Sequence, residues 1–267
     1  MTSPQMDAAH LSDLRELAVE AARRASRVLL KWVNVSDEQL QIENKGDGSP
    51  VSQADYASHA TILDALAPSN LPILSEEGEQ VEWAQRKDWQ WFWLVDPLDG
   101  TEAFVRYRSD FAVNIALCGP DGPVIGVVAD PCAGQIYSGL VGEGARRESL
   151  DGASRTPLNP PPPTPPYRLV TSRNESASLH ELLPPGFSGD EVHAEPVSGA
   201  LKFCLVASGE ADIHSRTGAY MEWDCAAGDG VLRAMGLVVY DWVTGEPMTY
   251  NKESLWVWGL WVSRVQR

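Results

Sequence analysis

The sequence predicts a mixed fold of helices and strands (α+β or α/β) arranged as two lobes. Three observations support this prediction: helical spacing of apolar residues in the first 66 positions, short strand-like runs between residues 71 and 140, and a proline-rich break at 157–166. At 267 residues the chain has room for two ordinary domains. We therefore predict an N-terminal lobe at 1–156, a proline-rich connection at 157–166 and a C-terminal lobe at 167–267.

Two helices are predicted at the start of the chain. From Leu11 to Leu29, apolar residues recur at intervals of three and four, and most charged residues fall on the other positions. This spacing is typical of a helix with one buried face. A second helix is predicted from about Gln53 to Leu66, and the segment Lys45–Pro50 between them has the composition of a turn.

Strands are predicted next, because short apolar runs alternate with turn residues. The runs are Leu71–Leu74, Trp91–Val95, Val113–Cys118, Val124–Ala129 and Gln135–Leu140. The last three, with Gly and Pro turns between them, indicate an antiparallel meander. The first two lead into Glu76 and Asp96. Open sheets commonly place ligand sites beyond the carboxyl ends of their strands, so these two acids are site candidates.

The segment Pro157–Pro166 holds seven prolines in ten positions, which excludes a helix or a central strand and predicts an extended chain. We favour a stiff linker or exposed loop between the lobes over a ligand for a proline-binding module.

Further helices and strands are predicted in the C-terminal lobe. They are a strand at Tyr167–Thr171, a turn and helix start at Ser172–Asn174, a helix at Ser198–Ser208, a strand at Ala211–His214, a helix at Trp223–Met235 and strands within Val238–Val262.

The charge balance limits the classes of partner. There are 21 basic and 37 acidic side chains, a net charge of −16, which disfavours nucleic-acid polymers and anionic membranes as partners. The segment Met1–Asp13 has no features of a signal peptide, and no apolar run is long enough to span a bilayer. The 4 cysteines include no C-x-x-C pair. We expect a protein of the reducing cytoplasm, with a location at the periphery of the inner membrane as an alternative.

The most informative segment is Trp93–Thr101, WLVDPLDGT. A buried strand leads into Asp96, and Asp99 follows three residues later in a tight turn, so two carboxylates and a backbone carbonyl can converge on one point. Mg²⁺ prefers such oxygen ligands. Thr101 then lies near a helix start, where amides favour a phosphate oxygen. Phosphatases of the haloacid dehalogenase type use Asp-x-Asp instead, and an acidic turn without a ligand is the plainer alternative.

Three other segments repeat this arrangement, because each has a carboxylate where a strand ends or a helix begins. They are Asp47–Asp55, Ser75–Gly78 and Glu222–Gly228. An acid at a helix start also has an ordinary explanation, since it offsets the helix dipole. Four such segments in one chain favour a shared site.

Together the four segments resemble the inositol monophosphatase superfamily of Mg²⁺-dependent, lithium-sensitive phosphatases. The family pattern is Glu-Glu, then Asp-Pro-(Leu/Ile)-Asp-Gly-Thr, then Trp-Asp-x-Ala-Ala-Gly, and the resemblance extends from Asp47 to Tyr250. It implies a layered αβαβα sandwich of two lobes, as in the sugar phosphatases.

Four segments resemble the corresponding segments of the bacterial 3'(2'),5'-bisphosphate nucleotidases of sulfate assimilation. They are Leu74–Glu77, Tyr107–Leu117, Ser198–Ala207 and Tyr240–Trp242. This resemblance implies hydrolysis of 3'-phosphoadenosine 5'-phosphate, or its 5'-phosphosulfate, to AMP or adenylyl sulfate. The alternatives are a phosphatase of inositol or sugar phosphates and a non-catalytic regulator that binds metal or nucleotide. Glu102, where the nucleotidases usually carry lysine, leaves the first alternative open. Cys225 replaces a common threonine and is expected to pack.

The resemblance also implies a role for each site residue. Glu76, Asp96 and the Leu98 carbonyl would hold one Mg²⁺, and Asp96, Asp99 and Asp224 would hold a second, with a third, weaker ion near Glu76. Asp55 and Thr101 match the pair that orients and deprotonates the attacking water, with Glu76 also at the catalytic centre.

The same resemblance implies the substrate contacts, and the substrate would be a small phosphorylated nucleotide. The predicted contacts are Glu76, Leu98, Asp99, Gly100, Thr101, Ser198, Lys202, Arg216 and Asp224, with Ser172 and Arg173 as weaker candidates. A monomer and a homodimer both fit the sequence.

Overall fold

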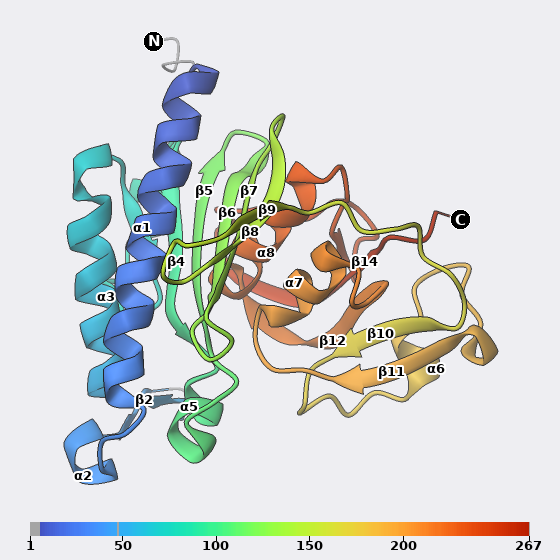
Figure 1. Cartoon of the computed structure of the whole chain (residues 1–267), viewed down its shortest axis with the longest axis horizontal. Coiled ribbons are helices and arrows are strands. Elements are labelled where there is room, and N and C mark those ends of the chain that lie inside the picture. Colours follow the sequence, from blue (N-terminus) through green and yellow to red (C-terminus); the bar gives the residue numbers. More distant parts are fainter. Residues whose placement is uncertain (1–5, 47, 267) are drawn as a thin grey trace.

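The computed structural model describes residues 6–46 and 48–266, and its elements form layers in the order αβαβα (Figure 1). Asp47, the first residue of the predicted acidic segment Asp47–Asp55, lies outside these residues. The first layer consists of α1 (Ala8–Trp32) and α3 (Gln53–Leu66), which pack against each other and against one face of a seven-stranded sheet. The predicted layered sandwich is therefore confirmed.

The second layer is this seven-stranded sheet, whose strands lie in chain order from β3 to β9. They are β3 (Ile73–Ser75), β4 (Phe92–Asp99), β5 (Ala112–Gly119), β6 (Gly122–Asp130), β7 (Gln135–Leu140), β8 (Gly144–Ser149) and β9 (Arg155–Pro157). β3 is parallel to β4, and every later pair is antiparallel. The predicted meander is confirmed, and it is extended by β8 and β9, which were not predicted.

The remaining layers lie on the other face of that sheet. α7 (Leu201–Ser208) and α8 (Glu222–Ala234) form the central layer, and α6 (Leu179–Leu182) covers the far face of a five-stranded sheet. That sheet runs in the order β11 (Val192–Pro196), β10 (Tyr167–Thr171), β12 (Ile213–Met221), β14 (Trp256–Ser263) and β13 (Tyr240–Asp241). Because α8 belongs to the C-terminal half yet packs on β5, β6 and β7, the two halves of the chain share a core.

Short elements connect the layers. They are α2 (Asp37–Leu40), β1 (Glu43–Asn44), β2 (Pro50–Val51), the 3₁₀ turns Ala67–Ser69 and Gly189–Glu191, α4 (Trp83–Arg86) and α5 (Thr101–Tyr107).

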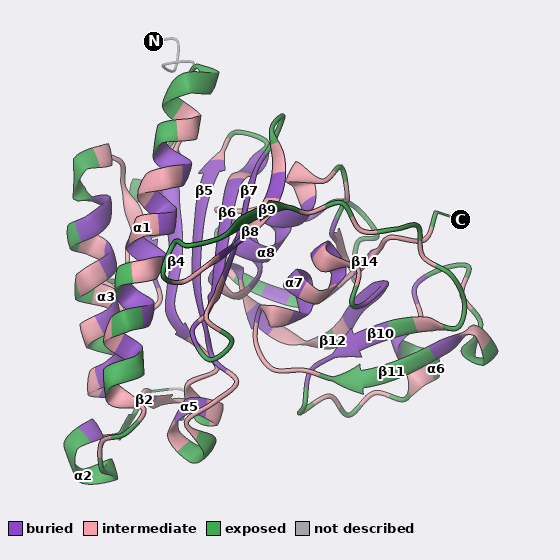
Figure 2. Ribbon diagram, viewed as in Figure 1, coloured by how far each residue is buried: buried purple, intermediate pink, exposed green. Residues whose placement is uncertain are grey.

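Burial explains why the central strands are apolar on both faces. Residues of β4, β5 and β6 are buried almost throughout, since α1 and α3 cover one face of the sheet and α8 covers the other (Figure 2). Alanines of α1, such as Ala18 and Ala22, are fully buried and allow this helix to approach the sheet closely. On the other face, α8 presents Gly230 to Gly126 of β6, and a Cβ at Gly126 would lie 2.1 Å from the Ala227 carbonyl oxygen.

Some boundaries differ from prediction. The predicted helix start at Ser172–Asn174 is wrong, since α6 begins at Leu179. α7 begins at Leu201, so Ser198 precedes it. The strand predicted at Ala211–His214 continues to Met221 as β12, because β14 supplies an antiparallel partner along its length. β4 also runs past Pro97 to Asp99, with a register shift between Asp96 and Asp99 that accommodates the proline.

The proline-rich segment connects the two sheets. Between β9 and β10 no regular helix or strand forms, as predicted. Leu158 N donates to the Ala145 carbonyl at 2.9 Å, and Arg264 donates to the Pro161 carbonyl, so both halves of the chain contact this segment. Among the described residues, no helix is long and apolar enough to cross a membrane.

Candidate active site

Two parallel strands bring the first two carboxylates together. β3 pairs with β4 in a register that sets Ser75 opposite Val95, and Glu76 N donates to the Val95 carbonyl at 3.1 Å. Glu76 and Asp96 are therefore neighbours just past this pairing. Glu76 follows the end of β3, as predicted, whereas Asp96 lies inside β4, just past the residues that pair with β3.

Two helix starts add further carboxylates to the same edge. Asp55 and Asp224 each occupy the third position of a helix, where the carboxylate accepts a hydrogen bond from the capping residue. Met221 N donates to Asp224 Oδ2 at 2.8 Å, and Ser52 N donates to Asp55 Oδ2 at 2.8 Å. Such caps hold both side chains in place without occupying their second oxygens.

Three carboxylates form a group that could hold a metal ion. Ligand oxygens of Glu76, Asp96 and Asp224 all lie within 4.8 Å of one another. Burial and the neighbouring charges of Glu76, Asp99 and Asp224 raise the pKa of Asp96 well above its usual range. Burial and the charges of Asp99 and Glu76 raise the pKa of Asp224 to about 8. Carboxylates gathered in this way repel one another unless a cation or protons offset their charge.

Asp99 lies beside this group but faces the C-terminal half. Its carboxylate accepts hydrogen bonds from Ala200 N, which is in front of α7, and from Asn114 Nδ2 at 3.1 Å. Gly199 adopts a φ of +56°, and a Cβ there would lie 2.7 Å from Asp99 Oδ2. Glycine at 199 therefore permits the close approach of the two halves at this point.

Thr101 and Asp55 lie within hydrogen-bond distance, as the predicted catalytic pair requires. Thr101 Oγ1 is 3.0 Å from Asp55 Oδ1 and 3.0 Å from the Leu98 carbonyl oxygen. Leu98 N donates to Asp96 Oδ1 at 3.0 Å, which stabilises the turn between the two acids. Gly100 closes this turn at φ +89°, where an added Cβ would lie 3.0 Å from the Asp110 carbonyl oxygen. These contacts bring Asp55, Leu98 and Thr101 to a common point.

Two of the predicted substrate contacts on the C-terminal half, Lys202 and Arg216, already have partners within the protein. Lys202 is buried, and its Nζ donates to the Gly199 carbonyl at 2.6 Å and the Val197 carbonyl at 3.3 Å. Burial lowers the pKa of this amine to about 8. Arg216 stacks on the Tyr220 ring, with its guanidinium carbon 3.7 Å from the ring centroid. Lys202 is therefore not a solvated position of its helix.

The weaker candidates lie at the rim of the site. Arg173 is exposed and bridges the two halves: its Nε donates to Ser198 Oγ at 2.9 Å and its Nη2 to Asp110 Oδ2 at 2.9 Å. Ser172 is buried. At the two departures from the family pattern, Glu102 pairs with Arg106 at 3.1 Å on the surface of α5, and Cys225 is buried, as expected.

Lys45 also lies at this site and was not predicted. Its Nζ lies 2.7 Å from Glu76 Oε1 and 2.5 Å from Glu77 Oε1. The two acids raise the pKa of Lys45 although burial opposes the shift, and burial raises the pKa of Glu77 to about 7. In the sequence, Lys45 is only a lysine beside a Gly-rich turn. Its distance to the two acids is fixed only when the chain folds.

Comparisons with known proteins agree with this geometry. The sequence pattern of the inositol monophosphatase family matches residues 10–262. A 3'(2'),5'-bisphosphate nucleotidase CysQ of Escherichia coli is 36% identical over 234 residues, which cover 87% of this chain and 92% of that protein. CysQ of Haemophilus influenzae is 32% identical over 219 residues, or 80% of each chain.

Solved structures give the same result for the fold. The crystal structure of CysQ from Bacteroides thetaiotaomicron matches with a TM-score of 0.82 and 30% identity, covering 97% of this chain and 100% of that chain. An inositol monophosphatase from Anabaena matches with a TM-score of 0.68 at 22% identity, covering 96% of this chain and 92% of that chain. The second similarity concerns the fold alone.

Proposed function

This chain belongs to the inositol monophosphatase family, and from that membership we propose that it is a metal-dependent 3'(2'),5'-bisphosphate nucleotidase. Its substrate would be 3'-phosphoadenosine 5'-phosphate, or the 5'-phosphosulfate, and its products phosphate and AMP or adenylyl sulfate. The observation that carries the proposal is the group of Glu76, Asp96 and Asp224 next to the Asp55–Thr101 pair. The similarity to CysQ over most of both chains favours the nucleotide among the family's substrates.

The donor atoms fit a hard divalent cation, and we propose Mg²⁺. All are oxygens, namely the carboxylates of Glu76, Asp96, Asp99 and Asp224 and the Leu98 carbonyl, and the raised pKa values of the buried acids indicate charge that needs an opposite partner. We propose two to three ions, held as the family resemblance implies. Bound Mg²⁺ would supply Lewis-acid chemistry, which acidifies water and offsets the charge of a phosphate.

The chain's own residues would then direct the water. Asp55 accepts the hydroxyl hydrogen of Thr101, so a lone pair of Thr101 Oγ1 stays available to accept a proton from water at this edge. As the water oxygen bonds to phosphorus, its proton would pass to Thr101 Oγ1, which gives its own hydroxyl hydrogen to Asp55. The bond between phosphorus and the ribose 3'-oxygen would break, and that oxygen would leave with the electron pair and take a proton from solvent water. No covalent phosphoenzyme is needed. The amides of Gly100 and Thr101 are proposed to support the scissile phosphate.

The rest of the nucleotide is proposed to lie against the C-terminal half. Lys202 and Arg216 supply positive charge there, with Ser198 at the rim. Their charge would complement the second phosphate of a bisphosphate substrate, whereas an inositol monophosphate has no second phosphate to use it. This difference is our physical reason for preferring the nucleotide.

A role in sulfate assimilation, a cytoplasmic location and inhibition by lithium complete the proposal. The cysteines of the described residues are free, which fits a reducing compartment. A monomer and a homodimer both fit these features.

Phosphate release tests the proposal directly. We expect faster turnover of 3'-phosphoadenosine 5'-phosphate than of inositol 1-phosphate, and loss of both activities when EDTA removes Mg²⁺. Faster turnover of inositol 1-phosphate would make the chain an inositol phosphatase, the candidate that Glu102 left open. Absence of turnover with every phosphoester would favour a non-catalytic regulator.

A further inference from the structure

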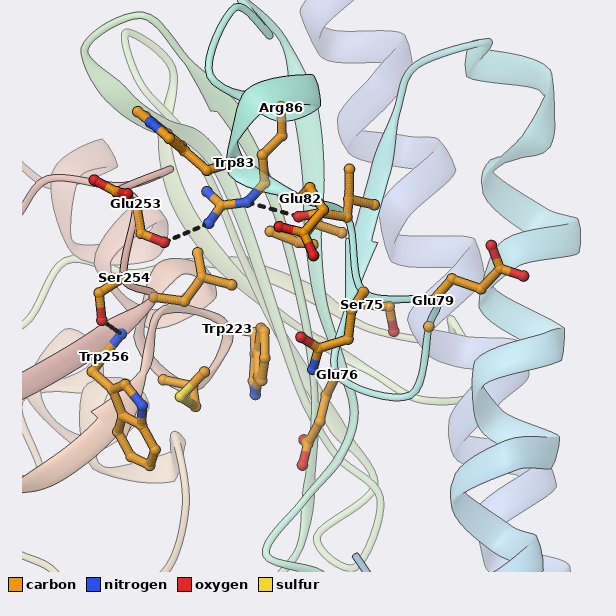
Figure 3. Close-up of a pocket in the computed structure, with 16 residues that line it drawn as sticks. Ser75, Glu76, Glu79, Glu82, Trp83, Arg86, Trp223, Glu253, Ser254 and Trp256 are labelled. Carbon is orange, nitrogen blue, oxygen red and sulfur yellow. Dashed lines mark hydrogen bonds between the residues drawn. The ribbon is translucent and has the colours of Figure 1, made fainter. Parts of the chain in front are cut away.

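The candidate metal group is assembled from two parts of the chain that face each other across a cavity. Glu76 follows β3, and Asp224 lies in the first turn of α8. A cavity of about 350 Å³ separates the segment after Glu76 from the start of α8 (Figure 3). Its lining includes Glu76, Gly78, Val81 and Arg86 from one part, and Met221, Trp223, Glu253 and Leu255 from the other. Packing is therefore incomplete along part of this boundary.

A buried arginine bridges the same boundary. Arg86, at the end of α4, is only 3% exposed. Its Nη1 donates to Asn251 Oδ1 at 2.9 Å and to the Lys252 carbonyl at 2.7 Å. Its Nη2 donates to the Glu253 carbonyl at 2.9 Å (Figure 3). Asn251 Nδ2 donates back to the Arg86 carbonyl at 2.8 Å. The planar guanidinium thus contacts three consecutive residues of one turn.

The other side of that turn is bound by the first residue of α8. Glu222 Oε2 accepts from Asn251 N at 2.6 Å, and Glu222 Oε1 accepts from Lys252 N at 3.1 Å. In addition, Glu222 N donates to the Leu255 carbonyl at 3.0 Å. Arg86 therefore binds acceptors of the turn while Glu222 binds its amides, and the turn 251–253 connects the β3–β4 segment to the start of α8.

We propose that Arg86 is a positioning residue, which acts through the turn 251–253 and Glu222 to set the distance between Glu76 and Asp224 and thereby the affinity for the divalent cation. The inference rests on the proposed function, which assigns both carboxylates to the metal. Outer partners of this kind typically change metal affinity by 10- to 100-fold when they are replaced. Without Arg86, the turn 251–253 would keep its contacts with Glu222 and lose those with the end of α4.

Two variants test this bridge. Arg86→Lys keeps a positive charge but replaces the planar fork, whose two terminal nitrogens donate to three residues, with a single ammonium nitrogen. Asn251→Gly removes the side-chain contacts with Arg86, keeps the backbone amides that Glu222 binds, and suits the positive φ of 61° at this position. The matched control is Arg15→Lys, because Arg15 is also a buried arginine but pairs with Glu143 at 2.9 Å, outside this bridge.

The readouts are equilibrium binding of Mn²⁺ to the metal-free protein, the Mg²⁺ concentration at half-maximal phosphate release, and the thermal midpoint with and without Mg²⁺. We expect Arg86→Lys to weaken metal binding about 10-fold or more, Asn251→Gly to weaken it less, and both to recover most of their kcat at high Mg²⁺. The control should lower the thermal midpoint and leave metal binding unchanged.

Two outcomes would overturn the inference, and they differ from each other. Wild-type metal affinity in both bridge variants, with only a lower thermal midpoint, would make Arg86 a purely structural residue while the proposed function stands. A wild-type protein that binds no Mn²⁺ and releases no phosphate would overturn the proposed function and this inference with it.

Discussion

The two regions that meet at the site have opposite electrostatic character. At the edge of the seven-stranded sheet, Glu76, Asp96 and Asp224 lie together, and within the described part of the chain only Glu76 of the three forms an ion pair, with Lys45. At the facing edge of the C-terminal half, Lys202 and Arg216 are positive and already contact carbonyls or a ring. The first region needs a cation to balance its negative charge, whereas the basic groups of the second region already have partners within the protein.

This difference separates two tasks. A cluster of like charges costs stability, so its presence favours a ligand that offsets the charge. A basic group held by its own backbone carbonyls costs less and needs only to exchange those contacts for a phosphate. The acidic region should therefore control turnover and metal dependence, and the basic region should control substrate preference.

The largest effect is expected at the acidic region. Asp96→Asn should lower phosphate release about 100-fold or more, because it removes a charged ligand at the centre of the group while keeping its shape. The fold should remain intact by circular dichroism. Substantial residual turnover at saturating Mg²⁺ would show that Asp96 is not a shared ligand. It would also contradict the assignment of turnover to the acidic region.

Thr101→Val tests the hydroxyl rather than the charge. It removes the hydrogen bond to Asp55 but keeps the size of the side chain, so we expect kcat to fall about 100-fold with little change in metal affinity. Thr101→Ser is the matched control, since it keeps the hydroxyl and should retain most of the activity. Equal losses in both variants would assign the effect to packing.

A smaller and different effect is expected at the basic region. Lys202→Met should raise KM for 3'-phosphoadenosine 5'-phosphate about 10-fold, as for the loss of one charge-assisted hydrogen bond, and should change the Mg²⁺ requirement little. The rise in KM should be much smaller with 3'-AMP, which lacks the second phosphate. Equal changes in KM for both substrates would place Lys202 outside the contact with that phosphate.

The smallest effect concerns stability and pH. Burial, with nearby acids, raises the pKa of Asp224 from 3.8 to about 8 and that of Glu77 from 4.5 to about 7. The folded, metal-free protein thus binds these protons more tightly than the unfolded chain, and its free energy of unfolding should fall as pH rises from about 4 to 8. Lys202, with a pKa lowered to about 8, acts in the opposite direction only above that pH.

Denaturation in EDTA at pH 5 and pH 8, repeated with Mg²⁺, measures this effect. Added Mg²⁺ should restore most of the lost stability at pH 8, because it binds the ionised carboxylates. A metal-free protein that is more stable at pH 8 than at pH 5 would contradict the electrostatic contrast between the two regions.

Much of the fold follows from local patterns in the sequence. The spacing of alanine and leucine predicted α1, and short apolar runs predicted β5, β6 and β7, because amphipathic spacing reflects which face is buried. The acids Glu76, Asp96 and Asp224 were recognised from motifs at element ends. Strands β8 and β11 were missed, since Arg, Glu and His interrupt their apolar pattern.

Sequence patterns could thus name the acids and predict most of the elements that carry them. They could not show that Lys45 contacts Glu76 or that Arg86 bridges to the turn 251–253, because these contacts join segments that are far apart in the chain. They could not show that Lys202 is buried either, because burial depends on what packs around its helix. Local propensity and periodicity act over a few residues, whereas distances between side chains on different elements depend on how the layers pack. The net charge of −16 likewise shows nothing about where the acids lie. The fold gathers five of them at one edge, namely Asp55, Glu76, Asp96, Asp99 and Asp224.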